Sequence, residues 1–248
     1  MLVMDRRDHG VVVLRLAHGK VNVLDVDLLE AIIVAFGELG EARAVVLTGD
    51  GTSFSAGVDL RRILDNEVGD TEHFLDALSR ALLTFFTHPR PVVAAVNGHA
   101  IAGGCVLAAA ADVRLMSGGS IGLTELKVGV AFPTAALEIV RYATGAQARS
   151  LILSGRLVEP AEAVEVGLID RVVAPENLLD TALAEARTLT QIPAETYEIS
   201  KRQLHGPAMA AIAREYEIYD AGVARTWTSD RGRTAMSAFV ANLTQSRS

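Results

Sequence analysis

The chain reads Pro91-Val92-Val93-Ala94-Ala95-Val96-Asn97-Gly98-His99-Ala100-Ile101-Ala102-Gly103-Gly104-Cys105 near its middle. The apolar run 92–96 predicts a strand that is buried on both faces, and Asn97-Gly98 predicts a turn. From Gly103 to Ala111, small and apolar residues predict a helix. Because glycine carries no side chain, a glycine turn at a helix start lets a ligand approach the free N–H groups there.

On both sides of this segment, apolar strand patterns alternate with helical ones. Strands are predicted at 11–16, 44–48, 113–116 and 169–173, and helices at 25–39, at 71–86 and from near residues 133, 146 and 160. From Glu176 onward the pattern is almost purely helical. This alternation predicts an α/β core, to which we assign residues 1–192, followed by a helical region at 193–248. Large apolar side chains in that region, such as Trp227 and Phe239, predict packing on the core or on a partner subunit.

Composition excludes several classes of protein. Of the 248 residues, 50% are apolar, and the single cysteine, Cys105, rules out an internal disulfide framework and a cysteine-based zinc site. The net charge of −7 argues against a nucleic-acid partner. The start lacks the apolar region of a signal peptide, and the longest clean apolar run, 100–111, is too short to span a bilayer. We therefore expect a cytoplasmic protein with neither a membrane nor a nucleic-acid partner.

A second glycine turn follows the strand pattern at 44–48. It reads Phe54-Ser55-Ala56-Gly57-Val58-Asp59-Leu60. Two such turns could aim two backbone N–H donors at one developing oxyanion, and losing one donor from such a pair costs about 3–4 kcal/mol of activation free energy. Taken singly, each turn is more commonly a close-packed structural turn, because short glycine patterns are frequent in proteins.

Glu125 stands among apolar residues in the segment 121–129. A carboxylate in such surroundings has its charged form disfavoured, which raises its pKa toward that of a useful general base. The alternative is a solvated surface glutamate or one that is paired with Lys127. The local pattern alone favours this alternative.

In this order and spacing, the two turns and Glu125 resemble the crotonase superfamily of enoyl-CoA hydratases and isomerases. The resemblance covers nearly the whole chain and is also carried by the segments 19–24, 91–98, 153–156, 161–163 and 167–173. It implies a spiral of strand–strand–helix (ββα) units with a C-terminal helical region that builds a homotrimer or a dimer of trimers. It also implies an acyl-CoA thioester as substrate, with no cofactor and no metal.

The resemblance assigns roles to individual residues. The N–H groups of Val58 and Gly103 hold the thioester oxygen, and Glu125 is the catalytic base. The residues expected to bind substrate are Ser55, Ala56, Gly57, Leu60, Gly104 and Phe132. The depth of the acyl pocket is expected to depend on the packing of Leu64, Phe74, Leu75, Leu78 and Phe132. Arg231 and Arg233 could meet the CoA phosphates of a neighbouring subunit or form a solvated charge pair.

One departure from the hydratase pattern bears on the reaction. Hydratases of this superfamily use two glutamates, and the first of these falls at Val106, which cannot transfer a proton. One carboxylate suffices to move a double bond, because Glu125 can take a proton from C2 of a 3-enoyl thioester and return it at C4. Pro133, eight residues after Glu125, also resembles the Δ3,Δ2-enoyl-CoA isomerases. We therefore expect isomerase activity.

Two alternatives stay open at this point. A hydratase could draw its second carboxylate from the segment 61–71, which we expect to be mobile and which offers Asp65, Glu67 and Asp70. The competing interpretation of these three residues is an exposed acidic loop. The other alternative is a homologue that binds acyl-CoA without catalysis. His99 is expected to serve the turn more than the pocket, and Cys105 is expected to be a packing residue.

Overall fold

Two β-sheets form the centre of the computed structural model, which describes residues 1–65 and 67–245. The larger sheet has the strand order β1-β2-β3-β5-β7-β10, and the smaller one has the order β4-β6-β8-β9. The strands of the larger sheet are β1 (Leu2–Arg6), β2 (Val11–Leu16), β3 (Ala44–Gly49), β5 (Val92–Val96), β7 (Val113–Met116) and β10 (Arg171–Val172). Those of the smaller sheet are β4 (Ser53–Ser55), β6 (His99–Ile101), β8 (Ile121–Gly122) and β9 (Leu157–Val158).

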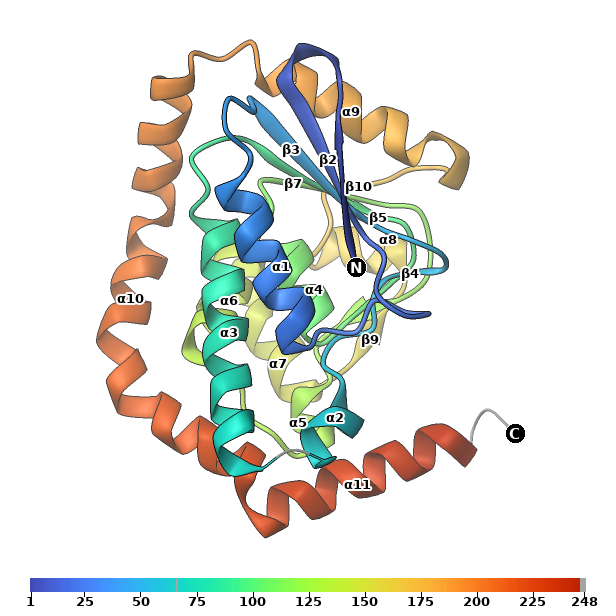
Figure 1. The fold of residues 1–248 in the computed structure, drawn as a ribbon, viewed down its shortest axis with the longest axis vertical. Coiled ribbons are helices and arrows are strands. Elements are labelled where there is room, and N and C mark those ends of the chain that lie inside the picture. Colours follow the sequence, from blue (N-terminus) through green and yellow to red (C-terminus); the bar gives the residue numbers. More distant parts are fainter. Residues whose placement is uncertain (66, 246–248) are drawn as a thin grey trace.

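From β3 to β8, successive strands alternate between the two sheets, and this alternation builds a spiral (Figure 1). β3, β5 and β7 are neighbours in the larger sheet, and the strands that follow them, β4, β6 and β8, are neighbours in the smaller one. Helices α2 (Leu60–Asp65), α4 (Gly103–Ala109) and α5 (Glu125–Val128) begin after these three pairs. Because β4, β6 and β8 run parallel, the turns that follow them meet at one edge of the smaller sheet.

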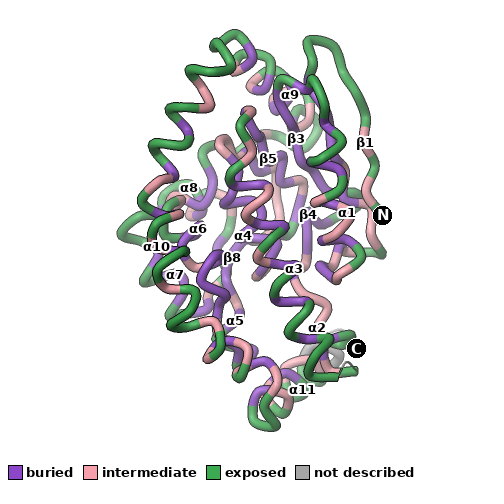
Figure 2. Tube along the Cα trace, turned by 60° about the vertical axis from the view of Figure 1, so that its left-hand side comes forward, coloured by how far each residue is buried: buried purple, intermediate pink, exposed green. Residues whose placement is uncertain are grey.

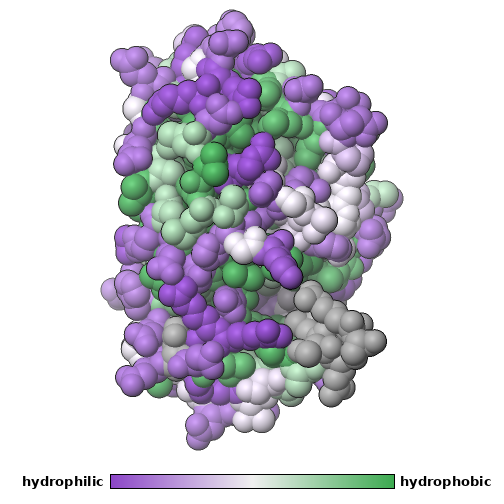
Figure 3. Space-filling model, turned by 45° about the vertical axis from the view of Figure 1, so that its right-hand side comes forward, coloured by the Kyte–Doolittle hydropathy of each residue, from purple (hydrophilic) through white to green (hydrophobic). Residues whose placement is uncertain are grey.

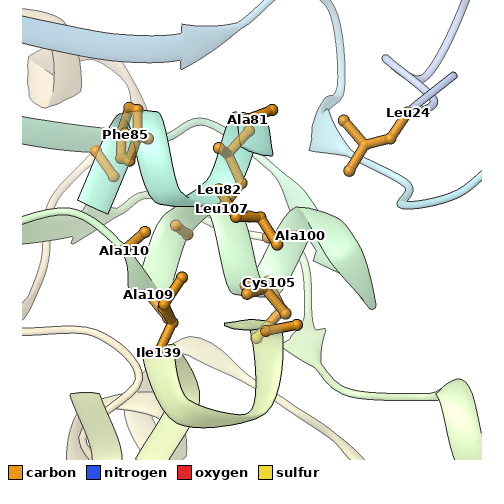
Figure 4. Close-up of a cluster of buried hydrophobic side chains, with 14 of the residues drawn as sticks. Leu24, Ala81, Leu82, Phe85, Ala100, Cys105, Leu107, Ala109, Ala110 and Ile139 are labelled. Carbon is orange, nitrogen blue, oxygen red and sulfur yellow. The ribbon is translucent and has the colours of Figure 1, made fainter. Parts of the chain in front are cut away.

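Strands β3 and β5 are buried along their whole length, because helices cover both faces of the larger sheet. Their side chains alternate between the two faces. Val46 and Val93, which are paired in register, pack toward α9 (Leu178–Leu189). The other face packs against α1 (Val26–Gly37), α3 (Val68–Phe86) and α4. Figure 4 shows part of this second cluster, with Leu82 beside Leu107 and Ile139 beside Ala109.

The C-terminal helices pass around the outside of this core (Figure 1). α10 (Ala194–Thr228) runs along α6 (Thr134–Thr144) and α3, and α11 (Asp230–Gln245) contacts α2 and α5. The remaining helices are α7 (Ala148–Ser154), α8 (Pro160–Glu165) and three short 3₁₀ turns, Asp8–Gly10, Gly145–Gln147 and Pro175–Asn177. No helix in the described part of the chain is long and apolar enough to cross a membrane.

Burial separates the interior from the helical exterior. Buried residues concentrate in the strands and on the inner faces of the helices, and the outer side of α10 is largely exposed (Figure 2). On the face shown in Figure 3, hydrophilic side chains surround smaller hydrophobic patches. The apolar half of the sequence is therefore turned mostly inward.

The strands predicted at 11–16, 44–48, 92–96 and 113–116 are confirmed, as are helices that begin near residues 133, 146 and 160. The expectation that residues 61–71 form a loop is wrong, while their mobility stays a prediction. Apart from residue 66, which lies outside the described residues, this segment contains α2 and the start of α3. α3 begins at Val68, after the N-cap Glu67, and therefore earlier than the predicted Thr71. The strand predicted at 169–173 shortens to β10, because an edge strand has only one neighbour, β7.

The helical region after residue 193 packs on the core of its own chain. Trp227 is buried, and Phe239 is partly buried against the same cluster, as predicted from their size. Tyr216 and Tyr219, in contrast, are 51% and 57% exposed. α10 begins at Ala194, while the division of the chain into domains 1–192 and 193–248 stays a prediction.

Candidate active site

Gly57 and Ala102 bring the two glycine turns into direct contact. A Cβ placed on Gly57 would lie 2.5 Å from the carbonyl oxygen of Ile101 and 3.0 Å from the Cβ of Ala102. Gly57 also has a φ of +80°, which residues with a side chain rarely adopt. Only glycine therefore fits at this position, and the turn after β4 packs directly on the turn after β6.

The backbone N–H of Val58 is left free by the way its turn pairs with Leu24. Leu24 donates to the oxygen of Gly57 at 2.8 Å, and Asp59 donates to the oxygen of Leu24 at 3.1 Å. In such a parallel bridge the residue between the two bonds, Val58, directs its own N–H away from Leu24. Within the described residues no backbone acceptor faces that N–H.

No backbone acceptor in the described part of the chain bonds to the N–H of Gly103, which is the first residue of α4, where backbone donors have no partner within the helix. Ala102, which precedes it, has φ 52° and ψ −123°, a strained conformation for a residue with a Cβ. This conformation sets the plane of the peptide that carries the Gly103 N–H. A Cβ on Gly103 would lie 3.8 Å from Cγ2 of Val58, so the two donor residues are neighbours across the turns.

Ser55 and Gly104 hold the same two turns from the buried side. The Ser55 hydroxyl donates to the oxygen of Asn22 at 2.7 Å and accepts from the N–H of Gly57 at 3.2 Å. A Cβ on Gly104 would lie 2.8 Å from the Cβ of Ser55. Ser55 is fully buried, so its hydroxyl serves the turn. Substrate contacts of Ser55 and of its partly exposed neighbours Ala56 and Leu60 stay predictions.

Glu125 is the first residue of α5 and is buried, with 7% of its surface exposed. Its Oε2 atom has no hydrogen-bond partner among the described residues. Burial raises the pKa of Glu125 to about 8, against the opposing effect of its own N–H and that of Thr124. The interpretation of Glu125 as a solvated or Lys127-paired surface residue is wrong, because the fold turns Lys127 outward and Glu125 inward.

Among the residues near Glu125 in the chain, Leu123 and Val128 are apolar and buried. Val106 and Phe132 belong to the same main hydrophobic core. Cys105 is buried as well, and burial together with the nearby charge of Glu125 raises the pKa of its thiol. Because Cys105 follows Gly103 by two residues, Glu125 lies near the start of α4. Cys105 is thus a packing residue, as expected.

α10 fixes the segment that follows α5. Trp227 donates its Nε1–H to the oxygen of Ala131 at 2.9 Å, and the Oγ1 of Thr226 accepts from the N–H of Ala131 at 3.0 Å. Asp220 accepts from the N–H of Thr134 at 3.1 Å. Phe132 lies between these anchored residues, so α10 determines where its ring stands.

α11 contacts both the helix that carries the base and the helix that follows Val58. Gly129, at the end of α5, packs against Ala235. Arg233 donates to the carbonyl oxygens of Ile63, at 3.3 Å, and of Leu64, at the end of α2. A cation is favourable there, because the C-terminal end of a helix carries a partial negative charge. Arg233 is thus engaged with α2 of its own chain, and a contact between Arg231 and a CoA phosphate stays a prediction.

The other expected candidates lie apart from Glu125 or on the surface. Asp65, Glu67 and Asp70 are all exposed. His99 is exposed too, and its Nδ1 lies 3.1 Å from the hydroxyl of Ser120, which confirms that it serves the turn.

Three contributors to the site are not evident in the sequence. Trp227 and Arg233 act across 96 and 169 or more residues, so no local pattern links them to their partners. For the backbone strain at Ala102, the sequence does offer one signal. Ala102 stands between the strand β6 and the glycine pair that opens α4.

The spiral of two sheets is the crotonase fold that the resemblance implies, and solved structures share it. The sequence model of the enoyl-CoA hydratase/isomerase family matches residues 6–245. This chain therefore belongs to the enoyl-CoA hydratase/isomerase family of enzymes.

Individual relatives carry both activities in their names. A protein of Thermus thermophilus named after the enoyl-CoA hydratases is 37% identical over 196 residues, which cover 77% of this chain and 76% of that protein. Human mitochondrial enoyl-CoA delta isomerase 1 is 29% identical over 79% of this chain and 67% of its own length. The crystal structure of human mitochondrial Δ3-Δ2-enoyl-CoA isomerase has a TM-score of 0.93 at 24% identity, covering 100% of this chain and 99% of that one. The last comparison shows the shared fold.

Proposed function

We propose that this protein moves the double bond of a 3-enoyl-CoA thioester to position 2, with Glu125 as the only catalytic carboxyl group. The observation that carries the proposal is the burial of Glu125, with Oε2 unpartnered within the described residues. The buried aliphatic side chain of Val106 stands where the family resemblance places the second glutamate of a hydratase. A base of raised pKa in an apolar site suits proton transfer to and from carbon.

The reaction balances with one base and two donors. The thioester oxygen accepts hydrogen bonds from the N–H groups of Val58 and Gly103. Glu125 removes a proton from C2, and the electrons of that C–H bond spread over the dienolate onto the oxygen. The same carboxyl group returns the proton to C4, so that the C2=C3 double bond replaces C3=C4. Each donor contributes about 3–4 kcal/mol of transition-state stabilisation in sites of this kind.

Hydration would require a second group to position and activate water. Val106 and Phe132 offer no polar atom for that purpose, and both are buried. Asp65, Glu67 and Asp70 are exposed on or between α2 and α3. These observations favour isomerisation over hydration, in which water would have to be held opposite the base.

An assay with two substrates tests the proposal. Conversion of 3-hexenoyl-CoA to 2-hexenoyl-CoA is expected to raise the absorbance of the conjugated thioester, and Glu125→Gln is expected to abolish it. Glu41→Gln, at an exposed position, is the matched control. Loss of absorbance when 2-hexenoyl-CoA is supplied would instead identify a hydratase. Binding of acyl-CoA with neither change would identify a non-catalytic homologue.

We further propose that the protein acts in the cytoplasm as a homotrimer or a dimer of trimers. Large apolar side chains on the outer side of α10 support this assembly, since Leu204, Ile218 and Tyr219 are 65%, 64% and 57% exposed. Light scattering behind a sizing column is expected to give three or six times the mass of the chain. A monomer across the concentration range would contradict the assembly.

A further inference from the structure

A line of side chains leads from the paired donors along α3. Leu78 lies beside Gly103, since a Cβ on that glycine would be 3.9 Å from the Cδ1 of Leu78. One turn earlier on the helix, about 6 Å along its axis, α3 carries Phe74 and Leu75, which are both buried. The acyl part of a thioester whose oxygen sits at Gly103 would meet these side chains next.

The ring of Phe74 meets Trp227 of α10 at the end of this line. Their ring centroids are 6.2 Å apart and their planes are inclined by 45°. The exposed fractions are 2% for Phe74 and 1% for Trp227. The bond from Trp227 to Ala131, next to Phe132, fixes the indole in place. Two large rings, held on different helices, therefore close the space beyond Leu78.

A groove of about 320 Å³ lies between α3 and α10 on the other side of this contact. Leu75, Pro133 and Val223 line it. Leu75 and Pro133 directly follow Phe74 and Phe132 in the chain, and Val223 lies one helical turn before Trp227. Its rim carries four carboxylates, those of Glu72, Asp76, Glu217 and Asp220. A negative rim repels the phosphates of CoA, so the groove suits the acyl end of the substrate and not the nucleotide end.

We propose that the Phe74–Trp227 contact is the end wall of the acyl pocket and restricts this protein to short acyl chains. The groove between α3 and α10 is the space into which a longer acyl chain extends when a smaller side chain replaces Phe74. The inference rests on the proposed function in taking an acyl-CoA thioester as the ligand. Neither ring touches the reacting atoms, so the contact determines specificity and leaves the chemistry to Glu125.

A binding experiment can monitor the Phe74–Trp227 contact directly, because Trp227 is the only tryptophan in the chain and all tryptophan emission comes from it. The protein is titrated with CoA and with saturated acyl-CoA thioesters of four to twelve carbons, while the heat of binding and the tryptophan emission are recorded. We expect the emission to change with a six-carbon or eight-carbon chain and not with CoA. Affinity is expected to fall about tenfold or more between six and twelve carbons. Unchanged emission with every bound chain, or equal affinity for all lengths, would overturn the proposal.

A matched pair of variants tests the same wall through turnover. Phe74→Leu and Phe85→Leu make the same change at two buried positions of α3, but Phe85 packs on Phe36 and not on Trp227. Phe74→Leu is expected to raise the ratio of kcat/KM for 3-dodecenoyl-CoA over 3-hexenoyl-CoA about tenfold. Phe85→Leu is expected to leave that ratio unchanged. Equal shifts in the two variants would show a general loosening of α3 and contradict the wall.

Filling the groove supplies a second, independent check. Ser79 lines the groove from α3, so Ser79→Trp introduced into Phe74→Leu is expected to return the ratio to the wild-type value. No effect of the added tryptophan would show that the longer chain runs elsewhere. If no 3-enoyl-CoA is isomerised, but saturated chains bind with a length limit that Phe74→Leu relaxes, the reaction fails and the wall stands. Equal turnover of 3-hexenoyl-CoA and 3-dodecenoyl-CoA by the wild type would support the isomerase reaction and contradict the wall.

Discussion

Gly129 of α5 and Ala235 of α11 pack so closely that a Cβ on the glycine would lie 2.5 Å from the Cβ of the alanine. Gly129 has a φ of +94° and ends the short helix that Glu125 begins. The contact thus places a helix from the end of the chain directly over the helix that carries the base. Glu125, four residues before Gly129, is buried, and this burial raises its pKa.

Gly129→Ala is expected to lower the free energy of unfolding by roughly 1–3 kcal/mol, because both the backbone conformation and the contact with Ala235 oppose a side chain. It is also expected to shift the acid limb of the pH–rate profile downward, since a displaced α11 admits water to Glu125. Gly69→Ala on α3, where a new Cβ meets nothing within 4 Å, is the control and is expected to be neutral or stabilising. Thermal unfolding and kcat/KM against pH check both parts. Equal unfolding temperatures for the two variants would contradict the role of the contact.

The pH dependence of catalysis follows from the same burial. Glu125 acts as a base only when it is ionised, and its pKa is raised to about 8. kcat/KM is therefore expected to increase with pH and to level off above about pH 8. A profile that is already flat at pH 6 would show that another group, or a less buried Glu125, takes the proton.

Ionisation of Glu125 is expected to favour catalysis and to lower the stability of the folded protein. Between its ordinary value of 4.5 and about 8, the folded protein keeps a proton that the unfolded chain has released. Stability is therefore lost as the pH rises through this window, and Glu125→Gln removes the loss. At pH 9 the inactive variant is expected to be more stable than the wild type by roughly 2–4 kcal/mol. Urea unfolding at pH 5 and pH 9 measures this, and a variant that is less stable at pH 9 would contradict it.

Arg233 is expected to support catalysis through α2. Arg233→Gln removes the cation from the carbonyl oxygens of Ile63 and Leu64, and α2 directly follows Val58. We expect kcat/KM to fall about tenfold, the size of change that a small misplacement near a site produces. Arg233→Lys is expected to restore part of the loss, and Arg149→Gln, at an exposed position of α7, serves as the control. Equal effects of Arg149→Gln and Arg233→Gln would exclude a specific role in holding α2.

Two histidines outside the site predict sensitivity to acid. Burial, with the charge of Lys201 in second place, lowers the pKa of His205 and of His88 to about 4. The unfolded chain binds these protons near pH 6.5, so stability is lost as the pH falls from about 6.5 to 4. His205 stacks on Phe86 with ring centroids 3.8 Å apart, and His205→Phe preserves this stacking without a titrating group. The variant is expected to lose less stability than the wild type between pH 7 and pH 4.5, whereas the exposed His73→Phe is expected to behave as the wild type does.

The parts of the fold that could be predicted are those in which a local pattern is long enough. The buried strands β3 and β5 are uninterrupted apolar runs, and Asp25 caps α1 through the N–H of Leu28 at 2.9 Å. β8, β9 and β10 have two residues each, which is too short for any periodicity to show. α2 went unpredicted because its six residues span fewer than two helical turns, which is too short for the apolar spacing of Leu60, Ile63 and Leu64 to establish a helical period.

The candidate site likewise has parts that a local sequence pattern predicts and parts that it does not. Val58, Gly57 and Gly103 could be identified because the glycine turns and the helix start are local features. The state of Glu125 could not, because its burial is a product of tertiary packing, in which its helix α5 contacts α7 and the distant α11. The local sequence, with Lys127 two residues away, favoured the surface, and tertiary packing reversed that preference.

The hydrogen bonds that join Thr226 and Trp227 to Ala131 span 95 and 96 residues, so the parts of the site are synthesised at different times. On a ribosome, the two glycine turns and α5 are synthesised well before α10 and α11 emerge. Under the proposed function, catalytic activity is therefore expected only of the completed chain, once α10 holds the segment that follows α5.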